Sequence, residues 1–233
     1  MTQFPPPGPS LPPVPTAPAA ERIRIAYQAR HQSDYIFSFW TALGWTVLTC
    51  GIFAYYVFYQ LMRRMRDHNR RRLELLDAAT TYAWEQAEAR GVSDEVRPAF
   101  ERIATHLAVL RQMTTEFRDP IAWTVLAVIS GGIATIVGWI LLDGDLVRHD
   151  YHEGAIEAEL AVVLGQLGAT VAPPDPARLK GRQNYVGRIV AYVLTCGIYG
   201  LWWLHDLMVQ PNQHFEENWA WEDGLAHAVQ TLG

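Results

Sequence analysis

Apolar positions are distributed very unevenly along the chain, in three long blocks separated by polar stretches. The blocks cover Ile36–Met62, Ile121–Leu142 and Val186–Leu207, and each is at least 22 residues long. About 20 apolar residues are enough for a helix to cross the hydrocarbon core of a bilayer. The pattern therefore predicts an all-α integral membrane protein with three repeated apolar helical segments.

The polar stretches carry helical periodicity of their own. After Ser93, apolar residues recur every three or four positions, and the same spacing returns between His152 and Gly168. This pattern is typical of amphipathic helices with one buried face. We therefore expect polar amphipathic helices to follow the apolar segments and to pack together at the membrane surface.

A short word is repeated near the middle of each block. Leu48–Ile52 and Leu194–Ile198 both read LTCGI, and Ile129–Ile133 reads ISGGI in the same register. Small residues in membrane helices commonly mark helix–helix contacts. We assign this helix-packing role to Gly51, Gly132, Gly197, Thr49 and Thr195.

The repetition divides the chain into five parts. Residues 1–20 form a proline-rich disordered arm, in which Pro9–Pro12 fits a PxxP docking pattern but is also explained as a solvated spacer. The remaining parts are repeat 1 (21–118, membrane segment 36–62 plus a helical linker), repeat 2 (119–168, membrane segment 121–142 plus an amphipathic helix), a linker (169–183) and repeat 3 (184–233, membrane segment 186–207 plus a C-terminal helix).

Two topologies fit the blocks, and the basic residues near their ends do not choose between them. We favour three alternating spans. In the alternative, the glycine of each word marks the tip of a re-entrant hairpin, and all flanking segments lie on one side of the membrane.

Polar residues next to the blocks are the candidates for chemistry. His68, His149 and His214 each follow the glycine of their block by 17 residues, and we expect them to contact lipid headgroups or neighbouring helix ends. Three imidazoles around a pseudo-threefold axis could instead hold zinc, but only in the hairpin topology. No ligand motif supports this, so we expect no metal and no cofactor. His205 and Asp206 form a possible ion-handling pair at the end of the third block.

The repeated word, HNRRR (His68–Arg72) after the first block and FRDP (Phe117–Pro120) before the second resemble an uncharacterised family of bacterial, mainly actinobacterial, membrane proteins. The family is a domain of unknown function with the motif L-T-C-G-I-Y-x-x-W-W. The resemblance implies a multi-pass protein of the cell inner (plasma) membrane and implies no activity.

These observations predict a membrane-embedded scaffold or adaptor that self-assembles or anchors a larger membrane complex. The alternative is an oligomeric small transporter or channel component. The expected partners are the lipid bilayer and either further copies of the chain or other membrane-protein subunits. A net charge of −5 excludes a generally basic nucleic-acid-binding protein, and no nucleophile elbow, phosphate loop or carboxylate dyad indicates an enzyme.

Overall fold

A computed structural model describes residues 17–175, 181 and 183–233, and within these ranges the chain forms helices and no strand. The all-α prediction is confirmed. Most of the predicted proline-rich arm, with its PxxP pattern, lies outside the described residues. The helices are α1 (Ala19–Gln28), α2 (Arg30–Ser33), α3 (Phe39–Leu48), α4 (Ile52–Ala89), α5 (Ser93–Thr115), α6 (Pro120–Ile129), α7 (Ile133–Gln166), α8 (Tyr185–Leu194) and α9 (Tyr199–Leu232).

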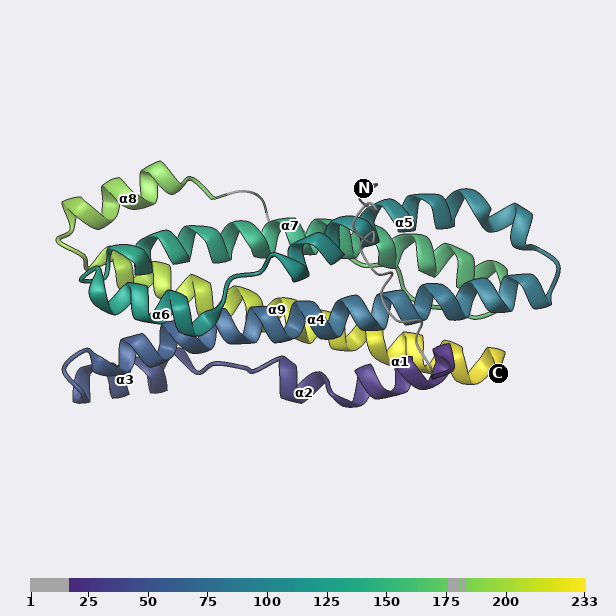
Figure 1. Cartoon of the computed structure of the whole chain (residues 1–233), viewed down its shortest axis with the longest axis horizontal. Coiled ribbons are helices and arrows are strands. Elements are labelled where there is room, and N and C mark those ends of the chain that lie inside the picture. Colours follow the sequence, from purple (N-terminus) through teal and green to yellow (C-terminus); the bar gives the residue numbers. More distant parts are fainter. Residues whose placement is uncertain (1–16, 176–180, 182) are drawn as a thin grey trace, which may run out of the picture.

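Three long helices, α4, α7 and α9, run side by side along the long axis of the molecule (Figure 1). At one end each is preceded by a short helix that folds back along it, so that α3–α4, α6–α7 and α8–α9 form three helical hairpins. At the other end α5 packs against α4 and α7, and α1 packs against α4 and α9. All three hairpin turns therefore lie at the same end of the bundle.

The repeated word is the turn of each hairpin. Cys50 and Gly51 have left-handed backbone angles, with φ of 50° and 91°, and the amide of Gly51 donates to the carbonyl of Thr46 at 2.8 Å. This bond closes the end of α3 in the way that left-handed residues commonly terminate helices. Gly132 and Gly197 have φ of 92° and 91° and donate to carbonyls five residues earlier.

The hydroxyl residue of each word joins the two helices of its hairpin. Thr49 Oγ1 donates to the carbonyl of Trp45 at 2.8 Å and accepts from the amide of Phe53 at 3.0 Å. It thus satisfies one of the free amides at the start of α4. Ser130 and Thr195 form the corresponding pair of bonds in the other two hairpins.

The predicted spans are wrong, because every apolar block is broken at its glycine and turns back. Among the residues that the structure describes, no helix combines the length and the apolar character needed to cross a membrane. This overturns the predicted multi-pass location in the inner membrane and leaves the integral-membrane assignment without support. The backbone follows the hairpin path that we had ranked second.

The predicted helix-packing role is wrong for two of the repeated glycines. A Cβ added to Gly51 or Gly132 would meet no atom within 4 Å, so these two serve the backbone turn, whereas a Cβ on Gly197 would lie 3.7 Å from Tyr192, in ordinary van der Waals contact. The tight contacts lie elsewhere: a Cβ on Gly138 would come within 2.5 Å of Phe58, and one on Gly200 within 2.7 Å of Tyr192.

The interior of the bundle is divided into two apolar clusters. One lies next to the hairpins and contains Met62 and Trp203, and the other lies toward α5 and contains Leu75 and Ile156. Between them is a layer of buried polar and charged side chains. This layer holds the residues that could carry chemistry.

Candidate metal centre

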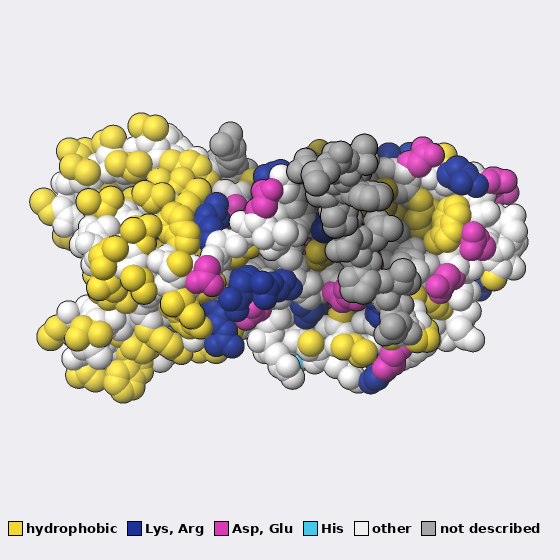
Figure 2. All heavy atoms as spheres, viewed as in Figure 1, with side chains coloured by type: hydrophobic (Ala, Val, Ile, Leu, Met, Phe, Trp, Pro, Cys, Tyr) yellow, Lys and Arg dark blue, Asp and Glu magenta, His cyan; other side chains and the backbone are white. Residues whose placement is uncertain are grey.

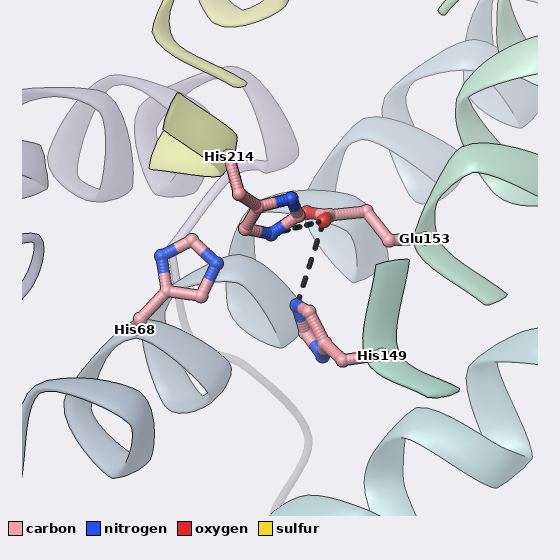
Figure 3. A group of neighbouring side chains, drawn as sticks. All are labelled: His68, His149, Glu153 and His214. Atoms are coloured by element: carbon pink, nitrogen blue, oxygen red, sulfur yellow. Dashed lines mark ion pairs between the residues drawn. The ribbon is translucent and has the colours of Figure 1, made fainter. Parts of the chain in front are cut away.

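The three register-matched histidines meet in the polar layer, one from each long helix (Figure 3). The ring centroid of His68 lies 5.4 Å from that of His149 and 5.3 Å from that of His214, and the last two are 5.9 Å apart. Their exposed fractions are 0–1%. The predicted contact with headgroups is therefore wrong. Because each histidine follows its turn by the same 17 residues, three parallel helices bring them to the same height.

Glu153, one helical turn after His149 on α7, completes a group of four possible metal ligands. One ligand atom from each of the four residues lies within 4.8 Å of the others. Glu153 Oε2 is 3.5 Å from His149 Nε2 and 3.2 Å from His214 Nε2. Neighbouring ligands of a tetrahedral ion with bonds of about 2.0–2.1 Å lie roughly 3.4 Å apart, so these two separations already fit.

Buried carboxylates orient two of the histidines. His68 Nδ1 lies 2.9 Å from Asp34 Oδ1, which leaves His68 Nε2 without a hydrogen-bond partner and directed toward the group. His214 Nδ1 lies 3.0 Å from Asp150 Oδ1, so its Nε2 also faces inward. A carboxylate behind a histidine is the usual support of metal-binding imidazoles, since it fixes the tautomer and raises the basicity of the ligand nitrogen.

Asp34 is itself held firmly, although it lies in the loop between α2 and α3. Its Oδ2 accepts from the guanidinium of Arg71 at 2.7 Å and from the indole of Trp219 at 2.8 Å. Burial opposes ionisation of this carboxyl, but His68 and Arg71 more than offset it, and the pKa lies below its usual range. The N-terminal segment thus contributes a fixed negative charge to the polar layer.

Arg72 links the centre to the far side of the bundle. Its guanidinium is fully buried and donates to Glu153, Glu157 and Glu222, the last at 2.8 Å. Burial penalises the charge of Glu153, yet attraction by Arg72 outweighs this and lowers its pKa well below the usual value. Glu153 is therefore an ionised ligand whose second oxygen is anchored. Glu157 and Glu222, the other two partners of Arg72, are 0% and 1% exposed.

The histidines differ in protonation. Burial lowers the pKa of His68 to about 4 and that of His149 well below its usual value, so both are neutral at pH 7 and have a lone pair for a metal. Burial also disfavours the charged form of His214, but its contacts with Asp150 and Glu153 more than offset this and raise its pKa to about 9. Without a metal, a proton on His214 supplies the positive charge between the two carboxylates.

Three imidazole nitrogens and one carboxylate oxygen suit zinc, iron, cobalt, nickel or manganese better than calcium or magnesium, which prefer oxygen ligands. All four side chains are 0–1% exposed. Four protein ligands in a closed site are typical of a structural metal, whereas a catalytic ion keeps one position open.

The predicted ion-handling pair lies apart from this group. Arg188 donates to Asp206 at 2.7 Å, and His205 stacks on Trp202 with ring centroids 5.6 Å apart. The negative charge of Asp206 is thus paired with a cation of α8.

Most of the residues around the histidines were not among the predicted site residues. Matching positions, four residues after each histidine, are occupied by Arg72, Glu153 and Asn218. This equal spacing could have predicted that the three residues lie near the histidines. The role of Arg64 was harder to predict from the sequence. Its buried guanidinium donates at 2.7 Å to the carbonyl of Leu207, which lacks a helical donor because residue 211 is a proline.

Comparison with known protein families, with curated proteins and with solved structures found no match to this chain. The resemblance to an uncharacterised membrane family stays a prediction.

Proposed function

We propose that the chain is a metal-binding scaffold in which one divalent transition-metal ion joins three helical hairpins. The observation that carries this proposal is the convergence of four donors, His68, His149, Glu153 and His214, to within 4.8 Å in the interior. The donors come from all three long helices, so one ion would cross-link the three repeats.

A structural role fits this centre better than a catalytic one. The four ligands are almost completely buried, and their supporting partners are buried as well, so the ligand atoms are shielded from solvent. Binding of an ion to the folded state alone stabilises that state by mass action, by about 2.7 kcal/mol at a free concentration 100 times Kd. The ion would thereby hold the hairpins in one arrangement, as a scaffold requires.

The test is stoichiometric metal binding by the purified full chain. The protein is stripped with a chelator, loaded with Zn²⁺, dialysed and analysed for metal content, and Mg²⁺ serves as the comparison ion. We expect one zinc per chain and a higher unfolding temperature with Zn²⁺ but not with Mg²⁺.

Two variants distinguish the buried group from other histidines. His149→Gln keeps a polar side chain of similar size and should abolish stoichiometric zinc, while His227→Gln, on the exposed face of α9, should keep it. Circular dichroism checks that both variants fold. X-ray absorption of the loaded protein should report nitrogen and oxygen ligands at about 2.0–2.1 Å. Equal zinc content in the two folded variants, or no retained zinc in the parent protein, would overturn the proposal.

A further inference from the structure

The surface of the molecule is strongly divided along its long axis. Of the 26 large apolar side chains that are exposed among the described residues, 21 lie in residues 39–62, 120–142 and 185–204, which we call the hairpin end. The space-filling view shows this end covered by apolar side chains, with charges gathered on the rest of the surface (Figure 2). The most exposed, each between 70% and 78%, are Trp40, Val47, Leu48, Ile52, Ile129, Ile133, Val186, Leu194 and Ile198.

The hairpin end carries almost no charge. Its only charged residue is Arg188, which is 8% exposed and paired with Asp206. Monomeric proteins rarely leave a continuous apolar surface of this extent in water, and large patches mark an interaction site. From the geometry we infer that the hairpin end inserts into one leaflet of a lipid bilayer without crossing it.

The length of the short helices fits one leaflet. Each of α3, α6 and α8 has 10 residues, which gives about 15 Å at 1.5 Å per residue. This is half of the roughly 30 Å hydrocarbon core of a bilayer. A hairpin of this depth ends near the midplane and returns to the side from which it entered.

The turns are built to tolerate lipid. A non-helical turn exposed to hydrocarbon is normally costly, because its amides and carbonyls lose water as a partner. Here Gly51 closes the end of α3, and Thr49 caps the start of α4, through the hydrogen bonds described above. The same bonds recur in the other two hairpins, so each turn satisfies these backbone groups within itself.

The border of the hairpin end fits a headgroup layer. Arg63 follows directly after the last apolar residue of the first hairpin, and its side chain is 49% exposed. Arg118 precedes α6 and is ion-paired with Asp145, and Arg148 is exposed six residues beyond Leu142 on α7. Exposed Tyr35 and Tyr56 lie beside the same border, as aromatic residues do at membrane interfaces. The exposed guanidinium groups of Arg63 and Arg148 pair readily with phosphate, and this complementarity favours a phospholipid surface over a second protein.

The test is flotation of the full chain with unilamellar vesicles of phosphatidylcholine and phosphatidylglycerol at 7:3. We expect the parent protein to float with the vesicles. A triple variant, Ile52→Asp, Ile133→Asp and Leu194→Asp, should bind more than about 100-fold more weakly, since each buried carboxylate is strongly disfavoured in hydrocarbon. The triple variant Ile25→Asp, Tyr151→Asp and Val162→Asp is the matched control, because it adds three carboxylates at side chains that are 52–57% exposed but lie outside the hairpin end.

Two parallel experiments test how deeply the hairpin end inserts into the bilayer and whether a second copy of the chain covers it instead. A spin label on Cys50, in a Cys196→Ser background, should report a position near the midplane, while no part of the chain becomes accessible to an impermeant reagent inside the vesicles. Equal flotation of the triple variant and the parent would overturn the inference. So would a parent protein that self-associates through the hairpin end in light scattering yet fails to bind vesicles. Circular dichroism and an unchanged midpoint of urea unfolding show that each variant is folded.

Discussion

Proton release on metal binding tests the electrostatics of the polar layer directly. In the metal-free protein His214 is the ligand that carries a proton at pH 7, because its pKa is raised to about 9, whereas burial keeps His68 and His149 neutral. At pH 7 roughly one molecule in 100 then has His214 free to bind, from the two-unit gap between pH and pKa. Binding of Zn²⁺ must displace this one proton.

The magnitude follows from the same pKa values. Between about pH 5 and pH 9 the apparent affinity should rise tenfold for each pH unit, and it should level off above the pKa of His214. From pH 6 to pH 8 this is a factor of 100, or about 2.7 kcal/mol. Titration calorimetry with a zinc-buffering competitor, in two buffers of different ionisation enthalpy, measures both the affinity and the number of protons released.

The expected count at pH 7 is one. Asp150→Asn weakens the contact that holds the proton on His214, so the count should fall below one and the pH slope should flatten. A count near zero in the parent protein would refute the assigned protonation of His214, and a count near three would refute the neutral state of the other two histidines.

Three further outcomes follow from the structure. In the absence of metal, stability should peak near pH 6.5. Because the folded pKa of His68, about 4, is below its unfolded value, His68 alone contributes a loss of up to about 3 kcal/mol as pH falls from 6.5 to 4, and His149, whose pKa is also lowered by burial, adds to this loss. Because the pKa of His214 is raised to about 9, a further loss of about 3 kcal/mol is expected as pH rises from 6.5 to 9, and urea unfolding at each pH measures both changes. Gly51→Ala should destabilise the protein by about 1–2 kcal/mol because φ is 91°, whereas Gly165→Ala, in open space on α7, should stabilise it by about 0.5–1 kcal/mol in the same denaturation assay. Asp34→Asn should weaken zinc binding 10- to 100-fold in competition titrations without changing the number of ions bound, since it removes the carboxylate behind His68.

The sequence pattern was sufficient for the helices and for the threefold repetition, but not for the path of the backbone. Block length alone favours membrane spans, because a hydropathy profile does not reveal a turn inside an apolar segment. The turn depends on two consecutive left-handed residues, and Cys50 gives no warning of this, since cysteine rarely adopts φ of 50°. Once the blocks turn back, their flanks come to lie on one side. The equally spaced histidines, which we had not taken as metal ligands, are then brought into contact with one another.

Identical residues at matched positions of the three repeats were easier to recognise than different residues that bind one another. The histidines are the same in all three repeats, and they stood out for that reason. One turn later the repeats carry Arg72, Glu153 and Asn218, which share nothing in sequence but bind one another and the histidines in space. Such a set requires three different repeats in one chain, because three copies of the first repeat would place three arginines around the same axis.

Arg72 is the member on which this complementarity depends most. Replacing Arg72 with methionine preserves much of the volume but removes the cation shared by Glu153, Glu157 and Glu222. Leaving a buried ionic group without its partner costs about 3–5 kcal/mol, so Arg72→Met should lower the free energy of unfolding by that amount. Arg63→Met, nine residues earlier on the exposed face of α4, should change it by no more than about 0.5 kcal/mol. If urea unfolding gave both variants the same small loss, the polar layer would not be what holds the three repeats in register, and the case for a metal that reinforces it would weaken accordingly.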